Sequence, residues 1–350
     1  KKKQLNLTSG PILRTLSELA LPIMASSFLS TAYNITDMAW IGMLGSKAVA
    51  GVGVGGMYVW LSQGLSSLAR MGGQVNMAHS LGRGDQKAAA GFAQAALQLT
   101  ILFSLFVTLI SMLFTNPLLH FFALNDAATY NSARIYMRIT CGLILFSFLS
   151  QVLTGLFTAQ GDSKTPLKAN FFGLILNMIL DPLLVLGVGP FPRLEVVGAA
   201  IATVLAQIIA FVICWIYMIR KYEILRLQKE DFKDPSPIMV KEMISAGMSM
   251  GFMSSLVNIG SLTLQTAINK LGKDIIIAHT AARKITEIFM IMFSVFGQTM
   301  ATYCGQNMGA GKIDRVKRGI WLAIVYTAIW SGLTIIASYT IGGWLVYLVT

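Results

Sequence analysis

The chain is dominated by repeated apolar runs of about 20 residues or more, and this pattern restricts its fold more than any other feature. Hydrophobic residues occupy 55% of the 350 positions and charged residues only 12%, roughly half the charged share of a typical soluble protein. A large soluble all-α protein would need polar helix faces, which these runs lack. We therefore predict an all-α membrane protein in direct contact with the lipid bilayer.

Nine membrane spans are predicted. They cover residues 15–43, 47–81, 87–114, 128–160, 166–187, 196–219, 243–270, 275–308 and 319–346. Several are longer than the ~20 residues needed to cross a bilayer, so tilted or kinked helices are expected.

The distribution of lysine and arginine predicts the orientation. With a cytoplasmic N-terminus, the cytoplasmic segments (1–14, 82–87, 161–168, 220–241 and 309–318) hold 18 of these residues, whereas the opposite ends hold six. This positive-inside bias predicts a multi-pass plasma-membrane protein, and we expect a bacterial inner membrane. The net charge of +12 is therefore a topology signal. It does not predict nucleic-acid binding, because the apolar spans leave no continuous basic face.

A repeat relates the two ends of the chain. The motifs MLG and GRGD are followed, 227 residues later, by KLG and GAGK. The interval from Gly45 to Gly82 is 37 residues, and so is the interval from Gly272 to Gly309. Both copies enter from the same side, so the repeat is parallel, as in the duplicated lobes of secondary transporters.

The longest polar stretch separates six spans from three. We predict an N-terminal six-helix lobe at 1–219, a cytoplasmic linker at 220–241 and the first three helices of a C-terminal lobe at 242–350. A second lobe as long as the first requires three more spans. We therefore expect twelve helices in a 6+6 arrangement in the natural protein, acting as a monomer.

Two acidic residues lie deep in apolar spans of the first lobe. Asp37 and Asp181 are each six or seven residues from the outer end of their span, and Thr203 lies at a similar depth. At ~1.5 Å per residue, all three lie about 10 Å below the outer surface. A charge in hydrocarbon costs a few kcal/mol or more, so such acids usually face a cavity or a partner. We predict one shared polar pocket.

Three polar neighbours strengthen this prediction. Asn177 precedes Asp181 by one helical turn, while Tyr33 and Asn34 share a helix face with Asp37. The carboxyl, amide and hydroxyl groups would bind H⁺ or Na⁺, and the residues alone do not decide between them.

Pro182 directly follows Asp181. It cannot donate to the carbonyl of Met178, and its ring opens that turn. We predict a bend that exposes a carbonyl beside Asp181, suited to water, a proton relay or Na⁺. The alternative is that Asn-x-x-x-Asp-Pro only caps and kinks a helix.

Further charged residues lie within the predicted spans. Arg283 precedes Glu287 by four residues, so an ion pair within the helix is expected, with a role in coupling as the alternative. Arg70 is expected either to line a cavity or to pair with an acid. The sequence shows no nucleotide-binding P-loop, nucleophile–base pair or metal cluster. We therefore predict no enzyme activity, no cofactor and no metal other than Na⁺.

Six motifs together resemble the multidrug and toxic-compound extrusion (MATE) family of the multidrug/oligosaccharidyl-lipid/polysaccharide exporter superfamily. They are LALPIMASSFLSTAYNITDMAWIGMLG (19–45), AHSLGRGD (78–85), TAQGDSKTP (158–166), NMILDPLL (177–184), VVGAAIATVLAQ (196–207) and GQNMGAGKIDRVKRG (305–319). The resemblance implies two six-helix lobes that form a V around a central cavity. It also implies export of amphipathic, often cationic compounds by alternating access, driven by entry of H⁺ or Na⁺. The acids of the family's first lobe match Asp37 and Asp181, and its polar neighbours match Asn177 and Thr203.

Two other functions remain as alternatives. A flippase for lipid-linked oligosaccharides or polysaccharides would need a cationic cavity, for which Arg70, Arg283 and Lys284 are the only internal candidates. A membrane enzyme should show a catalytic constellation, and a scaffold would not need buried acids at matching depth.

Overall fold

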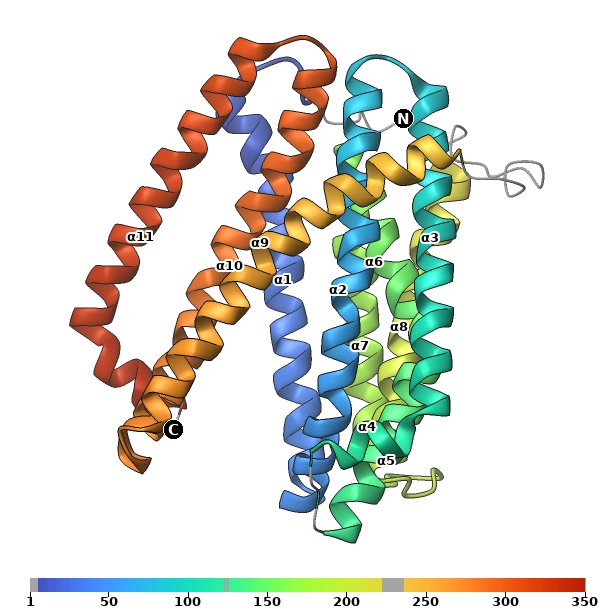
Figure 1. Ribbon diagram of the computed structural model, residues 1–350, viewed down its shortest axis with the longest axis vertical. Helices are drawn as coiled ribbons and strands as arrows, with labels where there is room; N and C mark the ends of the chain where they lie inside the picture. The colour runs from blue at the N-terminus through green and yellow to red at the C-terminus, as the bar shows by residue number, and fades with distance from the viewer. Residues whose placement is uncertain (1–5, 123, 125, 222–235, 350) are drawn as a thin grey trace.

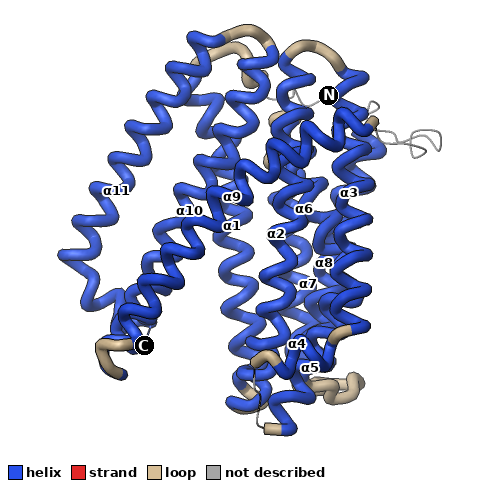
Figure 2. The backbone as a smooth tube through the Cα atoms, viewed as in Figure 1, coloured by secondary structure: helices blue, strands red, loops and turns tan. Residues whose placement is uncertain are grey.

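The computed structural model describes residues 6–122, 124, 126–221 and 236–349. Within these ranges the regular structure is entirely helical (Figures 1 and 2). The helices are α1 (Ile12–Gly42), α2 (Ser46–Gly82), α3 (Gln86–Leu113), α4 (Thr115–His120), α5 (Ala127–Gly142), α6 (Ile144–Ala159), α7 (Lys164–Val185), α8 (Val196–Lys221), α9 (Pro237–Asn269), α10 (Lys273–Gly309) and α11 (Ile313–Val349). The all-α membrane fold predicted from the sequence is confirmed.

The described helices outnumber the nine predicted spans for two reasons. The predicted span 128–160 is divided at Leu143 into α5 and α6, which meet at an angle of 50°. A short helix, α4, also lies in the preceding loop. By length and hydropathy, six of the described helices can cross a membrane, or seven if α5 and α6 form one bent span.

The predicted start of the seventh span at residue 243 is wrong. α9 begins at Pro237, because proline is well suited to the first turn of a helix, where its missing N–H has no partner to lose. α8 continues to Lys221, which lies within the predicted linker 220–241. Both ends of that linker are therefore helical. Residues 222–235 lie outside the described residues.

The repeat in the sequence is also a repeat in the backbone. α2 and α10 each have 37 residues, and α3 and α11 begin 227 positions apart. Gly45 and Gly272 precede α2 and α10 with nearly the same backbone angles, φ 107° and 102° with ψ 167°. Glycine is required at both positions because residues with a side chain rarely adopt these backbone angles.

The turns after α2 and α10 match as well. Gly84 and Gly311 have φ of 77° and 71°. In the first turn the N–H of Asp85 donates to the carbonyl of Ser80 at 3.0 Å, and the equivalent bond in the second turn is 2.8 Å. These bonds satisfy carbonyl groups that would otherwise be free at the helix ends.

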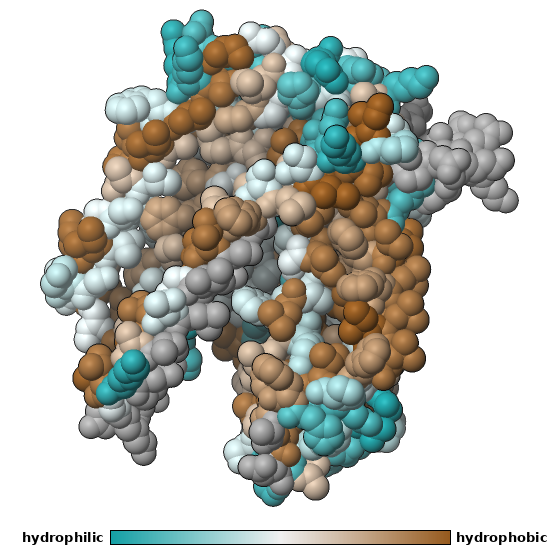
Figure 3. Space-filling view, viewed as in Figure 1, coloured by the Kyte–Doolittle hydropathy of each residue, from teal (hydrophilic) through white to brown (hydrophobic). Residues whose placement is uncertain are grey.

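Helices α1–α8 form one bundle, and α9–α11 lean against it at one end (Figure 1). The two parts meet near the turns that follow α2 and α10, and they diverge toward the opposite end. The space-filling view shows a hollow between them at that opposite end (Figure 3). The core of the larger bundle is rich in buried alanine, which allows its helices to approach closely.

The closest contact between the two parts is the crossing of α2 and α10. A Cβ atom at Gly82 would overlap the carbonyl of Gln306, and one at Gly309 would overlap the carbonyl of His79. These two contacts are equivalent under the 227-residue repeat. The pseudo-two-fold axis of the repeat therefore passes through this crossing, where one backbone touches the other.

Polar side chains add to this crossing. The Nε2 atom of Gln74 donates to Thr302 Oγ1 at 2.8 Å and to the carbonyl of Gln298 at 3.2 Å. The amide of Gln306 donates to the carbonyl of Ala159 at 2.6 Å. Helices of the first bundle are thus joined to α10 by hydrogen bonds on both sides of the glycine contact.

The segment before α1 is held by the turn between α10 and α11. The guanidinium of Arg315 donates to the carbonyl groups of Gly10 and Ser9 at 2.7 and 3.1 Å. Lys312 donates to the carbonyl of Thr8 at 2.7 Å. The end of the molecule where the two parts meet, here called the contact end, is therefore closed by both backbone packing and charge-assisted hydrogen bonds.

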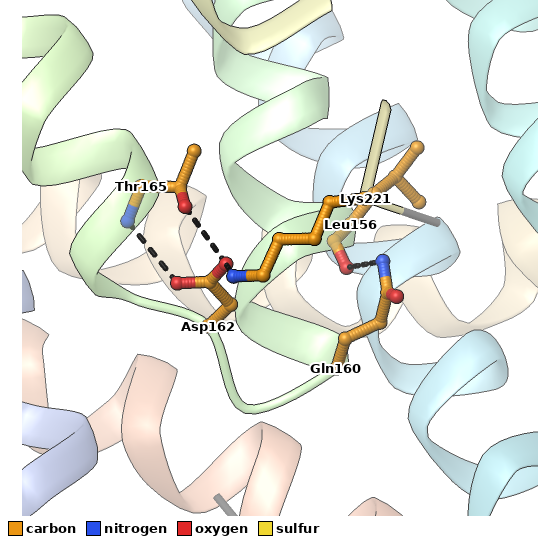
Figure 4. Close-up of polar contacts among 5 residues, drawn as sticks. All are labelled: Leu156, Gln160, Asp162, Thr165 and Lys221. Carbon is orange, nitrogen blue, oxygen red and sulfur yellow. Dashed lines mark hydrogen bonds and ion pairs between the residues drawn. The ribbon is translucent and has the colours of Figure 1, made fainter. Parts of the chain in front are cut away.

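A third polar contact fixes the end of α8 (Figure 4). Asp162, in the turn after α6, accepts a 2.5 Å bond from Lys221 and bonds from the hydroxyl and the N–H of Thr165 at 2.8 and 3.1 Å. Gln160 closes the end of α6 by donating to the carbonyl of Leu156 at 3.2 Å. This anchor lies directly before the residues that lead into α9.

We expect Gly309→Val to force α2 and α10 apart, because the obstructing atoms belong to the backbone and cannot rotate away. The loss should be about 1–3 kcal/mol, the usual cost of overpacking, seen as a lower melting temperature of the full-length protein in detergent. Gly297→Val is the matched control on the same helix, where a Cβ atom meets nothing within 4 Å. Equal melting temperatures for the two variants would contradict the assigned contact.

Asp162→Asn should lower stability in a pH-dependent manner. Burial acts to raise the pKa of Asp162, but the hydrogen bonds from Lys221 and Thr165 outweigh it, and the pKa lies below its ordinary value. A carboxylate with a depressed pKa stabilises the fold above its unfolded pKa, and this stabilisation is lost as the pH falls through the folded pKa.

The expected loss is about 1–3 kcal/mol. It should be constant between about pH 6 and pH 8 and should shrink below about pH 4. Thermal unfolding of the full-length variant at several pH values measures it, with Glu242→Gln on the exposed surface of α9 as the control. A penalty that grows on acidification would show that the ionised form is not the stabilising one.

Candidate functional site

The packing of α7 on α8 sets the depth of the candidate site. A Cβ atom at Gly198 would overlap the carbonyl of Leu184, and one at Gly173 would lie 3.1 Å from the carbonyl of Ala206. Small residues at two levels let the helices approach along most of their length. α1 packs on the other side of α7, so the polar faces of three helices converge.

Two carboxyl groups meet where these helices converge. The residues Asp37 and Asp181 are 6% and 0% exposed, and their carboxyl groups are near enough to interact electrostatically. Asn177, also fully buried, donates from Nδ2 to Asp181 Oδ1 at 3.2 Å. We call the cluster of six residues the acid pocket: Asp37, Asp181, Asn177, Tyr33, Tyr136 and Thr203.

The hydroxyl groups of the acid pocket lie on its other side. Those of Tyr33 and Tyr136 both approach that of Thr203. Five buried oxygen atoms of the pocket have no hydrogen bond of good geometry: Tyr33 Oη, Asp37 Oδ1, Asn177 Oδ1, Asp181 Oδ2 and Thr203 Oγ1. Buried oxygen atoms are rarely left unsatisfied without a reason, and carboxylate, amide and hydroxyl oxygens are ligands for small hard cations.

Two predicted site residues are placed differently from the others. Asn34 is exposed and lines a cavity of about 160 Å³ with Tyr33, rather than bonding to either carboxyl group. Pro182 lies inside α7, which continues as a helix to Val185. The Asp-Pro pair therefore does not end the helix, and the predicted exposed carbonyl at Met178 stays a prediction.

The remaining charged candidates are not part of the acid pocket. Arg283 and Glu287 form the expected ion pair, at 3.5 Å, and their side chains are 50% and 66% exposed. Arg70 lines a second cavity and donates from Nη1 to Gln298 Oε1 at 3.0 Å. In the part of the chain that the structure describes, no three His, Cys, Asp or Glu residues are grouped as metal ligands.

Two features of the site were missed from the sequence. Tyr136 lies in α5, a helix with several polar residues, and nothing in its spacing distinguishes it from its neighbours. Ser150, Thr154 and Thr158 of α6 line the second cavity. Their four-residue spacing within an apolar span is a visible signal of a polar helix face.

A bundle of membrane-length helices with a parallel internal repeat and buried acids defines a helical membrane transporter. The chain belongs to the MatE family, whose profile matches residues 22–183 and 249–350. The match confirms the resemblance predicted from the motifs. Members of this family are transporters and not enzymes.

Named relatives cover most of the chain at low identity. An FAD transporter of Shewanella oneidensis is 24% identical over 332 residues, 95% of this chain and 73% of its own length. A probable multidrug resistance protein NorM of Thermotoga maritima is 27% identical, over 87% of this chain and 65% of its own length. The multidrug export protein MepA of Staphylococcus aureus is 23% identical, over 97% and 74%. The chain thus spans about two thirds to three quarters of these relatives.

Solved structures support the fold. A MATE transporter described as being in the bent conformation has a TM-score of 0.91 at 20% identity, over 99% of this chain and 77% of its own. A MATE transporter of the MOP superfamily in an outward-facing conformation has a TM-score of 0.89 at 21% identity, over 100% and 77%.

The geometry of the acid pocket predicts selective cross-linking in the full-length protein. We expect Asp37→Cys combined with Asp181→Cys to react with a short bifunctional thiol reagent, because the two side chains approach each other. The control combines Asp37→Cys with Ile179→Cys, since Ile179 lies two residues before Asp181, on the opposite side of α7, and is 53% exposed. Mass spectrometry of the digested protein measures both yields, and equal yields would refute the shared pocket.

Proposed function

We propose that this chain is the larger part of a cation-coupled antiporter that exports amphipathic, often cationic compounds by alternating access. The supporting observation is the acid pocket, where two carboxyl groups are buried together and five oxygen atoms, two of them from these carboxyl groups, have no hydrogen bond of good geometry. Two ionised acids held side by side in a buried site are strongly unfavourable. A site that binds and releases a cation, however, needs such acids. The lobes are the predicted segments 1–219 and 242–350, acting in one monomer.

Entry of a cation would act through the contact between α1 and α7. With the pocket empty, two like charges repel each other, and binding of H⁺ or Na⁺ removes that repulsion. The resulting change in the packing of α1 against α7, with Pro182 as a weak point of α7, would bias the lobes toward one of two arrangements. Asn177, Tyr33 and Thr203 would complete the cation's partners, with Asn34 at the cavity wall. No cofactor is required.

The orientation follows from charge. The contact end of the molecule carries the basic turns and the N-terminal segment, and so would face the cytoplasm of a bacterial inner membrane. The hollow between the two parts then opens outward (Figure 3). In this arrangement substrate would leave through the hollow, and small amphipathic molecules and lipid would be the chain's partners.

The relatives' names bear on the substrate. Two are named for multidrug export or resistance and one as an FAD transporter, so export of a flavin-containing anion is a second candidate. A lipid-linked oligosaccharide flippase is less well supported. Of its three cationic candidates, Arg283 is half-exposed in an ion pair and Lys284 is exposed, which leaves only Arg70 on a cavity wall.

We expect Asp37→Asn and Asp181→Asn each to reduce ethidium transport by the full-length protein in vesicles by at least about tenfold, equivalent to ~1.4 kcal/mol. The amide keeps the shape of the side chain but cannot take up a proton or neutralise a cation. Proton and sodium gradients, imposed separately, identify the driving ion. Glu242→Gln, an exposed acid on α9, should transport normally. Undiminished transport by both Asp variants would eliminate this mechanism.

A further inference from the structure

We propose that the cavity beside Arg70 is an anion subsite, in which the guanidinium of Arg70 binds the carboxylate or phosphate group of a hydroxyl-rich substrate. The inference rests on the proposed transport function and names a substrate class for it. It concerns the second cavity, which lies on the contact-end side of the acid pocket.

The cavity has a volume of about 350 Å³ and is walled by α1, α2, α6, α7, α8 and α10. Of its sixteen lining residues, fourteen are polar, eight with hydroxyl groups and five with carboxamides. No aromatic or acidic residue is among them, so the described wall offers a lipophilic cation neither a counter-charge nor an aromatic face. A wall of hydroxyl and amide groups instead matches a substrate with many hydrogen-bonding groups.

Among the described residues that line this cavity, Arg70 alone is charged. Its Nη1 atom donates to Gln298, whereas its Nε atom is buried and has no hydrogen-bond partner. The hydroxyl of Ser26, on the same wall, is buried and unpartnered as well. A buried donor left without a partner costs about 1–3 kcal/mol, and a guanidinium is shaped to bind carboxylate or phosphate. An anionic group bound beside Arg70 would supply the acceptor that these donors lack.

The acids of the acid pocket lie away from Arg70. Of the α1 residues that line its cavity, Ser26 and Ser27 precede Asp37 by ten residues or more and Ser30 precedes it by seven, about 10–15 Å along a helix. The 160 Å³ cavity next to the acid pocket lies between, and the two cavities share Ser30, Asn170 and Gln207. The first lobe therefore has a polar path with acids at one end and a cation at the other.

This separation of charge is what an exporter of anions would use. A coupling cation would bind at the acid pocket while the substrate's anionic group binds at Arg70, and neither would compete for the other's partner. The competing explanation is that Arg70 only strengthens the α2–α10 crossing through Gln298. The two explanations differ in what happens when Gln298 is removed and Arg70 is kept.

The test uses purified full-length protein in lipid nanodiscs and a matched pair of fluorescent probes, riboflavin and riboflavin 5′-phosphate, which differ only in the phosphate. Wild type should bind the phosphate form at least tenfold more tightly. Arg70→Gln should abolish this preference, Arg70→Lys should retain part of it, and Gln298→Ala should keep most of it. Arg193→Gln, an exposed arginine in the loop before α8, is the charge-matched control. Binding of 6-carboxyfluorescein to the same variants tests whether the subsite also takes a carboxylate.

Each outcome decides one question. Equal affinity for riboflavin and its phosphate in wild type, with no binding of 6-carboxyfluorescein, overturns the anion subsite, and continued ethidium transport would leave the proposed antiporter intact. A loss of preference in Gln298→Ala equal to that in Arg70→Gln assigns Arg70 a structural role and overturns the subsite. The elution profile and the melting temperature of Arg70→Gln show whether that variant is folded. Binding of the anions without ion-driven transport of any probe would refute the antiporter and retain the subsite.

Discussion

The contact between the backbones of α2 and α10 is the constraint on which the rest of the structure depends. Gly82 and Gly309 allow each helix to touch a carbonyl group of the other, and the internal repeat places both contacts about one pseudo-two-fold axis. Because the two parts are joined at this end, they can diverge only at the other, where the hollow opens. In a bilayer, van der Waals packing and hydrogen bonds hold helices together, so two glycines and a few polar side chains are sufficient for such a junction.

The second organising principle is the separation of buried charge in the first lobe. A charge is expensive at the centre of a low-dielectric bundle, and the chain keeps the buried acids of α1 and α7 apart from Arg70 of α2. Had they been adjacent, they would have formed a neutral pair with no capacity to bind a ligand. Their distance leaves unsatisfied polar atoms at both ends of a polar path. In the function proposed above, this separation would let an ion and a substrate bind without competing for the same groups.

Much of this arrangement could be predicted from the sequence, and the failures have physical causes. The spans were found because apolar length is dictated by bilayer thickness, and Asp37, Asp181 and Asn177 stood out because polar residues are rare there. The division of the fourth span at Leu143 was missed because only a single glycine, Gly142, marks it within an otherwise continuous span. The start of α9 was placed too late because Lys241 and Glu242 interrupt the apolar run, although Ile238, Met239 and Val240 before them are apolar.

The sequence by itself determined the membrane class, the repeat, the depth of each buried acid and the face of the helix on which it lies, because these depend on periodicity and on distance along one helix. Only the tertiary structure decided which helices became neighbours. It placed Tyr136 beside Thr203, left Asn34 at a cavity wall, and directed Arg70 to Gln298 rather than to an acid. Such pairings depend on how small residues at several crossings let backbones approach, and this is a property of the packed bundle rather than of any single span.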